Sequence, residues 1–364
     1  MSNYLKIMHN LVQNPFTSIH VIDKEKFHTG MLKLLLEYCQ ANNIKHKLFK
    51  NNTLHKLECY LETKSVDLLV RQESPAKEIH KTIIEAKFKT GLHVTDYKNK
   101  VVSQIQKYAY THPEASEGIV VSLFKESTDL SIEKHEFIKQ FKNITFTNQV
   151  LDLINKTLRH SNKDSIHVYN LLVIWGNYLT NLKGIVNEFE KHKLNLIAIE
   201  NLKDNLQKLR LKGVFQQYRM NLVKVKVDKL INSDKISKGK LGNTHGNAFL
   251  HHEITFGKND FNFEKYGIQW QNGKLKFYIE LKNKGNKIER RDSALKEIGT
   301  FLHDNFFKEN VLPKNVNRNG KFKSFNIAKV EEFSDLNKLP NQMADSLNYL
   351  VNNAEIILEL TAQN

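Results

Sequence analysis

Apolar residues in the first part of the chain switch between a helical period and short strand-like runs. Between Lys26 and Gln40, apolar side chains recur at three- and four-residue intervals, which predicts an amphipathic helix: Met31, Leu32, Leu34, Leu35 and Tyr38. Three short β-prone runs follow, separated by charged, turn-like stretches. They predict three consecutive strands, at Leu57–Thr63, Val66–Arg71 and Thr82–Phe88.

The helical period returns after the third of these strands. Val101, Val102, Ile105 and Tyr108 are spaced for one face of a helix, which predicts a helix over residues 95–111 that ends before a proline. Three further elements are expected: a strand at Gly118–Phe124, a short strand at Ile144–Thr147 and a helix at Gln149–Leu158. This order of elements predicts an α/β domain over residues 1–160, with helices flanking a sheet.

The second half of the chain is expected to form a helical connector and then an α+β domain. The polar run His160–Ser165 predicts a boundary, and the proline-free, Leu- and Ile-rich stretch after it predicts two or three helices within a connector of residues 161–230. A polar loop is expected at Asn232–Asn247. The domain 231–364 is expected to contain strands at Tyr266–Trp270, Lys274–Lys282 and Phe325–Val330, and helices at 293–307 and 341–362.

Charge favours a polyanionic partner. The chain has 364 residues, with 55 Lys and Arg against 39 Asp and Glu, so its formal net charge is +16. A solvated lysine coat, typical of a composition rich in Lys and Asn, is the alternative explanation of this charge.

Cysteine usage and hydropathy narrow the class of protein. The only thiols, Cys39 and Cys59, form no CxxC pair, so no zinc knuckle or redox motif is predicted and a reducing, cytoplasmic compartment is expected. The N-terminus lacks the pattern of a secretory signal, and no window approaches the length of a membrane span. Secretion and membrane insertion are therefore not expected.

Two acids and an amine are expected to converge in the first domain. Asp67 lies inside the apolar strand VDLLV, while Glu85 and Lys87 share one face of the strand TIIEAKF because they are two residues apart. If a hairpin joins these strands, the two carboxylates lie close together and repel each other unless a cation joins them. Oxygen ligands favour Mg²⁺ or Mn²⁺, and such a site suits phosphodiester hydrolysis, with Lys87 as an electrostatic helper.

An acid-x-Lys triplet alone is weak evidence, because four occur in the chain: Glu62-Lys64, Glu85-Lys87, Asp96-Lys98 and Glu280-Lys282. Only the triplet that begins at Glu85 follows another strand with an embedded acid and precedes a helix that carries Gln104 and Tyr108. These two residues are four apart and share a helix face.

This arrangement resembles the PD-(D/E)XK nuclease superfamily, in the branch whose core is followed by a Gln-x-x-x-Tyr helix. The matching residues are Asp67, the Glu85-Ala86-Lys87 triplet and the pair Gln104 and Tyr108; Val66 stands where the family has proline. The resemblance covers about residues 20–160 and implies a restriction-endonuclease-like mixed sheet.

The resemblance also implies roles for individual residues. Asp67, Glu85 and the carbonyl of Ala86 would bind the metal, and Glu25, four residues before a threonine on the first helix, would complete its shell. Lys87 would serve catalysis. Gln104 and Tyr108 would order the site or contact the nucleic-acid backbone.

Structural explanations compete with each of these roles. The triad of Asp67, Glu85 and Lys87 is alternatively a cross-strand ion-pair group on an exposed sheet face. Gln104 and Tyr108 are also ordinary helix residues, and Glu25 is also a typical first-turn acid.

Two further patterns of charged residues resemble sites but are explained better by structure. For the triplet at Glu280, the possible upstream acid is Asp260, which lies in a mixed polar and apolar segment and not in an apolar strand. No Gln-x-x-x-Tyr helix follows this triplet, so a solvated strand edge is favoured. The run His251, His252 and Glu253 alternates between sheet faces, which argues against a metal site. No P-loop, GxSxG or HExxH motif is present.

Basic residues supply candidate contacts to nucleic-acid phosphates, and ordinary surface loops explain them equally well. The candidates are Lys89, Lys107, Lys238, Lys240, Arg290 and Arg291.

The sequence therefore predicts a Mg²⁺-dependent nuclease that hydrolyses DNA, and family analogy associates such proteins with bacterial defence against foreign DNA. The alternative is a catalytically inactive subunit of the same fold that binds nucleic acid or assembles with other chains. A third hypothesis is that the C-terminal domain senses a ligand or a protein partner. A second copy of the chain, in a homo-oligomer, is an alternative partner.

Overall fold

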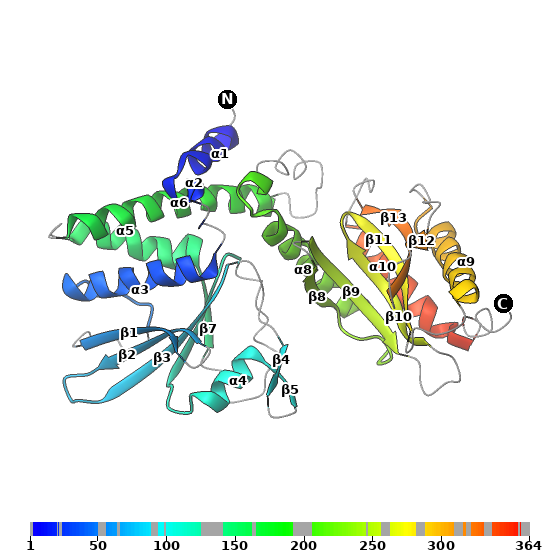
Figure 1. Cartoon of the computed structure of the whole chain (residues 1–364), viewed down its shortest axis with the longest axis horizontal. Coiled ribbons are helices and arrows are strands. Elements are labelled where there is room, and N and C mark those ends of the chain that lie inside the picture. The colour runs from blue at the N-terminus through cyan, green and yellow to red at the C-terminus, as the bar shows by residue number, and fades with distance from the viewer. Residues whose placement is uncertain are drawn as a thin grey trace. The chain divides into compact units, whose positions relative to one another are not determined.

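The chain is a mixed α/β protein, and its computed structural model contains two compact units (Figure 1). Unit 1 comprises Met1–Lys191 and Lys203–Val214, and unit 2 comprises His192–Leu202 and Phe215–Asn364. The structure describes residues 3–19, 21, 24–49, 56–63, 66–88, 94–97, 100–124, 141–161, 165–191, 206–244, 247–255, 263–281, 288–308, 316–317, 322–330, 337–355 and 357.

Unit 1 contains a five-stranded mixed sheet in the order β1-β2-β3-β6-β7. Strands β1, β2 and β3 are antiparallel neighbours, whereas β6 runs parallel to β3, and β7 parallel to β6. The bounds are β1 Lys56–Thr63, β2 Val66–Glu73, β3 Ile79–Lys87, β6 Glu117–Ser122 and β7 Phe141–Thr145. The three predicted consecutive strands and the hairpin between the second and third are confirmed.

Helices cover both faces of this sheet. Helix α3, Glu25–Ala41, contacts β1, β2 and β3 with its apolar side, and α6, Ile166–Lys191, contacts α3 (Figure 1). Helix α4, Gln104–Thr111, lies on the other face, where Tyr108 packs in a cluster with Ile83 and Val120. The predicted order of helix, three strands, helix and strand is present. Helices α1 Asn3–Gln13, α2 Pro15–Ser18 and α5 Leu151–His160 also belong to unit 1.

The predicted helix over residues 95–111 is wrong in its first half. Val94–Tyr97 and Lys100–Ser103 form a hairpin of two strands, β4 and β5, and the helix begins only at Gln104. Each of these short strands contains β-branched residues, which favour an extended backbone. The spacing of Val101 and Val102 relative to Tyr108 is therefore not a helical period.

A second difference lies after β7. The predicted strand Ile144–Thr147 ends two residues early, at Thr145, because a π-helical turn, Phe146–Val150, leads into α5. Phe146 and Val150 are fully buried, so this turn places two apolar side chains under the helix that follows.

Helices from the stretch predicted as a connector pack into different units. Helix α6 contacts α1, α3 and α5 and so belongs to unit 1. Most of α8, Lys212–Leu230, belongs to unit 2, because Met220, Val223 and Val227 lie in the core of that unit.

Unit 2 contains an all-antiparallel sheet of six strands in the order β12-β13-β11-β10-β9-β8. The bounds are β8 Lys240–Thr244, β9 Asn247–Thr255, β10 Phe263–Gln271, β11 Lys274–Leu281, β12 Val316–Asn317 and β13 Phe322–Lys329. The three predicted strands of this domain are confirmed. The loop predicted at Asn232–Asn247 is wrong in part, because β8 lies inside it and pairs with β9 through backbone groups, for which polar side chains are no obstacle.

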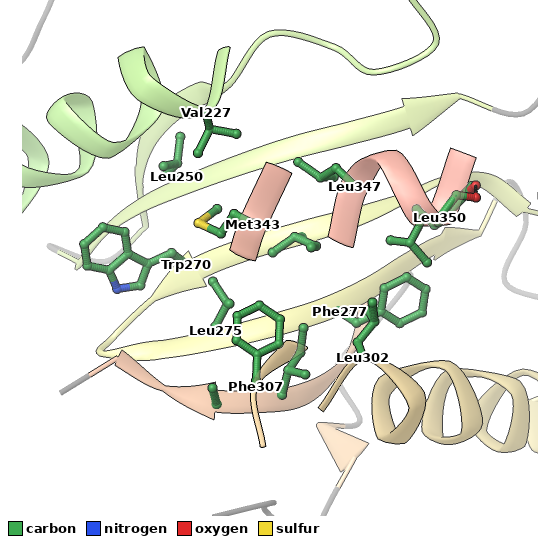
Figure 2. Packing of buried hydrophobic residues seen from close by; sticks show 14 of the residues in the cluster. Val227, Leu250, Trp270, Leu275, Phe277, Leu302, Phe307, Met343, Leu347 and Leu350 are labelled. Carbon is green, nitrogen blue, oxygen red and sulfur yellow. Dashed lines mark hydrogen bonds between the residues drawn. The ribbon is translucent and has the colours of Figure 1, made fainter. Parts of the chain in front are cut away.

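Helices α8, α9 and α10 pack against one face of this second sheet and enclose a core. The bounds are α9 Ile288–Phe306 and α10 Leu339–Asn352, which correspond to the helices expected at 293–307 and 341–362; residues 358–364 lie outside the described part. Figure 2 shows Val227 of α8, Leu302 of α9 and Leu347 of α10 around Trp270 and Phe277. Among the described helices, none is both long enough and apolar enough to cross a membrane.

Candidate functional site

The register of β2 and β3 brings Asp67 and Glu85 together. Leu69 pairs with Ile83 and Leu68 with Ile84, so continuing the ladder by one residue places Asp67 opposite Glu85 on the same sheet face. The Asp67 carboxylate lies against the next strand, where its Oδ2 accepts a hydrogen bond from the backbone N–H of Ala86 at 2.8 Å. The structure thus juxtaposes the two acids that the sequence singled out.

Glu85 is the centre of a buried hydrogen-bonded network. Its Oε1 lies 2.5 Å from the Lys87 Nζ and accepts a hydrogen bond from the Gln104 Nε2 at 2.5 Å. Its Oε2 accepts a hydrogen bond from the Tyr108 hydroxyl at 2.5 Å. Only 1% of Glu85 and 6% of Lys87 is exposed, so the ion pair is shielded from water.

Helix α4 supplies two of these contacts because it covers the face of the sheet that carries Glu85. Gln104 opens the helix and Tyr108 follows one turn later, so both side chains point to the same carboxylate. The Gln104 Nε2 also donates to the Tyr108 hydroxyl at 2.6 Å. The predicted pair on α4 therefore meets the predicted acid on β3.

Electrostatic coupling within the group is strong. Burial, and then the negative charge of Glu85, raise the pKa of Asp67 to about 7. Burial lowers the pKa of Lys87, but the charge and hydrogen bond of Glu85 outweigh it, so the pKa lies above its ordinary value. Burial and the charge of Glu85 also raise the pKa of Tyr108, which keeps the hydroxyl protonated as a donor.

Glu25 lies within electrostatic reach of the group. It is the first residue of α3, and its charge contributes to the raised pKa of both Asp67 and Lys87. Within the described part of the chain, however, no three His, Cys, Asp or Glu side chains gather in an arrangement that would ligate a metal. The predicted contribution of Glu25 to a metal shell stays a prediction.

The donor set of the site fits a hard divalent cation. Its candidate ligands are the carboxylate oxygens of Asp67 and Glu85. When ionised, these two groups carry two negative charges against the single positive charge of Lys87, so the group favours a cation. A carboxylate offers roughly four lone-pair positions, and three on Glu85 are used by Lys87, Gln104 and Tyr108, which leaves one. The Gln104 Oε1 is buried at the same place and has no hydrogen-bond partner, so it is a further oxygen donor available to a cation or its water.

The predicted phosphate contacts are distributed over both units. Lys107 lies on α4 in unit 1, whereas Lys238 and Lys240 belong to unit 2. Lys238 is exposed, but the Lys240 Nζ is 2.8 Å from the Glu253 Oε2 and is partly neutralised. Lys89 lies outside the described residues. Arg290 and Arg291 lie at the start of α9, and the structure describes only their backbone.

The two rival patterns in unit 2 form other contacts. His252 and Glu253 point to opposite faces of β9: the His252 Nε2 is 3.0 Å from the Asp228 Oδ1, and Glu253 pairs with Lys265 at 2.9 Å. Glu280 pairs with the same lysine at 3.3 Å. Asp260 and Lys282 lie outside the described residues.

Ser122 is a buried polar neighbour that sequence reasoning missed. It lies in register with Lys87 on β6, and its hydroxyl donates to the backbone carbonyl of Phe124 at 2.8 Å and lies 3.1 Å from the Asn143 Oδ1 on β7. The only signal in the sequence is one serine within the apolar run GIVVSLF. Such a signal identifies a buried hydroxyl without indicating which strand lies beside it.

Comparison of the chain with protein-family models, with curated proteins and with solved structures found no match.

Proposed function

We propose that the chain is a metal-dependent nuclease that hydrolyses DNA phosphodiester bonds. The observation that carries this proposal is the convergence of Asp67, Glu85 and Lys87 on one sheet face, with Gln104 and Tyr108 holding Glu85 from the following helix. The order of α3, three antiparallel strands, α4 and the parallel β6 supports a restriction-endonuclease-like fold for unit 1.

Each side chain has a role that follows from its surroundings. Lys87 remains charged despite burial and counters negative charge that develops on a phosphate. Tyr108 and Gln104 fix the orientation of Glu85, and the N–H of Ala86 fixes that of Asp67. Asp67 and Glu85 would hold Mg²⁺, and the bound ion would supply the positive charge that lowers the pKa of an attacking water.

The second candidate function is a nucleic-acid-binding or assembly subunit without catalysis. One observation favours it: three internal donors already occupy both oxygens of Glu85. A network satisfied from within is also what a structural polar core requires.

A cleavage assay distinguishes the two candidates. Supercoiled plasmid is incubated with the full chain in Mg²⁺ or Mn²⁺, and wild type is compared with Glu85→Gln and Lys87→Met. We expect both variants to lose about 100-fold or more of the cleavage rate, because each removes charge at the reacting phosphate or at the metal. Glu58→Gln is the matched control, since Glu58 also pairs with a cation, Arg71, on a strand of the same sheet.

The result that would exclude the nuclease is binding of plasmid by wild type and all variants with no metal-dependent cleavage by any of them. Equal cleavage by wild type and Glu85→Gln would exclude this site. Circular dichroism confirms that each variant is folded. A role in defence against foreign DNA rests on family analogy alone and stays a prediction.

A further inference from the structure

The sheet of unit 2 has a polar face opposite its apolar core. On the three central strands, residues alternate so that Trp270, Phe277 and Phe325 point into the core. Their neighbours in sequence therefore point to the other face, and three of these lie in one row: Gln269, Lys276 and Asn326. We refer to these three residues as the polar row.

The cross-strand register places the polar row side by side. Gln269 pairs with Lys276 across β10 and β11, and Lys276 pairs with Asn326 across β11 and β13. Neighbouring strands are about 4.8 Å apart, so the row spans about 10 Å, which is the size of a small organic molecule.

Lys276 is buried without a compensating acid. Only 7% of it is exposed, and among the described residues it forms no ion pair with a carboxylate. Its Nζ donates to the Gln271 Oε1 at 3.3 Å, which does not neutralise its charge. Burial, and then the charge of Lys274, lower its pKa, as expected for an ammonium that lacks an anion.

The side-chain amide oxygens on either side of Lys276 accept no hydrogen bond from the described residues. The Gln269 Oε1 and the Asn326 Oδ1 are both buried and have no partner. Gln269 as a whole is 7% exposed. A buried acceptor without a partner is a position at which a ligand or an ordered water can supply the missing donor.

The acids on the same face are engaged elsewhere. Glu253 pairs with Lys240 and Lys265, and Glu280 pairs with Lys265. On β9, His251 extends the polar row, and its ring stacks on that of Tyr278 with the centroids 6.0 Å apart. The face thus combines an uncompensated cation, two acceptors and an aromatic pair.

We propose that the polar row of unit 2 binds a small organic anion that also carries N–H or O–H donors, of the class of nucleoside monophosphates. The phosphate compensates Lys276, the hydroxyl and amine groups satisfy Gln269 and Asn326, and the base has the ring of His251 beside it. This site is separate from the proposed nuclease centre of unit 1 and does not depend on that activity.

The first test measures the stability of the free protein. A lysine kept for a ligand costs stability when no ligand is present, so Lys276→Met is expected to raise the thermal midpoint by about 2 °C or more. Lys274→Met is the matched control, because Lys274 lies two residues away on the same strand and is exposed. Its removal relieves only the repulsion that it exerts on Lys276, so it is expected to raise the midpoint by less than Lys276→Met does. A lower midpoint for Lys276→Met would assign the lysine a structural role and overturn the proposal.

The second test measures binding by calorimetry of the full chain with AMP, GMP, CMP and UMP. At least one is expected to bind wild type and Lys274→Met, with affinity reduced at least tenfold in Lys276→Met and in Gln269→Leu. Adenosine, which lacks the phosphate, is expected to bind at least tenfold more weakly than AMP. Absence of binding by all four monophosphates, or equal binding by Lys276→Met, would overturn the proposal.

Discussion

Asp67 has an unusual proton affinity for an aspartate, and this makes the stability of the metal-free protein depend on pH. Its pKa in the folded state is about 7, against an ordinary value of 3.8. Between these values the folded state holds a proton that the unfolded state has released, so stability falls as pH rises from about 4 to about 7 and is level above that. The loss is on the order of 2 kcal/mol, which is less than the full difference in pKa implies, because this carboxyl retains some contact with solvent.

Urea denaturation of wild type and Asp67→Asn between pH 4.5 and about 8 checks this prediction. The variant is expected to lack this component of the pH dependence and to be more stable than wild type at the upper end of the range. An unchanged pH dependence in the variant would show that Asp67 does not carry the proton.

Tyr108 is expected to stabilise unit 1 through its hydroxyl as well as its ring. The hydroxyl donates to the buried Glu85 and accepts from Gln104, so Tyr108→Phe leaves a charged carboxylate short of one donor. A hydrogen bond to a buried charge is worth about 2 kcal/mol, and we expect a loss of that size in urea denaturation. Tyr110→Phe, on the same helix but 54% exposed, is the control and is expected to cost little. Equal effects of the two substitutions would contradict the network.

At the scale of elements, sequence patterns identified most of what carries the site. The β2–β3 hairpin and the helix with Gln104 and Tyr108 were predictable, because alternation places Glu85 and Lys87 on one face and a four-residue spacing aligns the two helix residues. The hairpin of β4 and β5 was not, because four-residue strands are too short to show a period. The strand β8 was missed because its residues, KLGNT, carry a loop composition while its backbone pairs with β9.

The contacts of Glu85 depend partly on residues that are distant in sequence, and no local sequence pattern predicts them. Its oxygens meet Lys87 from the same strand, which spacing predicts, but also α4 side chains that reach it only when the helix crosses the sheet. The hydrogen bonds that α4 donates to this carboxylate follow from tertiary packing, and they were not predictable from the sequence alone. The same holds for the polar row, whose register depends on a β-bulge beside Lys276.

Helix α3 contains a glycine that its surroundings do not require. A Cβ added to Gly30 would meet nothing within 4 Å, and its φ is not in the left-handed region. Gly30→Ala is therefore expected to stabilise the protein by about 0.5–1 kcal/mol through helix propensity. In Gly184→Ala on α6, the new Cβ would lie 2.7 Å from the Ile7 Cδ1, so its gain is expected to be smaller or absent. Urea denaturation of both variants checks the difference, and a loss of stability in Gly30→Ala would contradict it.

At the scale of the whole molecule, the net charge of +16 predicts salt-dependent binding to nucleic acid. If about six lysines and arginines contact phosphates, affinity for a DNA duplex falls about 1000-fold between 50 and 200 mM salt. Fluorescence anisotropy without divalent metal measures this separately from cleavage, and Glu85→Gln is expected to bind as wild type does. A solvated lysine coat without a defined contact surface would instead give weak binding that no single substitution changes.

The charged groups of unit 2 make this last prediction specific to individual residues. Lys238 is exposed, whereas Lys240 is held 2.8 Å from a Glu253 oxygen and is partly neutralised in the free protein. If unit 2 contributes to the DNA-binding surface, Lys238→Ala makes the dependence of log affinity on log salt concentration less steep, by about the amount expected for one phosphate contact. Lys240→Ala reduces this dependence by less. Equal effects would mean that DNA displaces Glu253 from Lys240, and no effect of either would confine the DNA surface to other residues. The comparison thus tests whether the basic charge of unit 2 acts on nucleic acid or stabilises its own sheet.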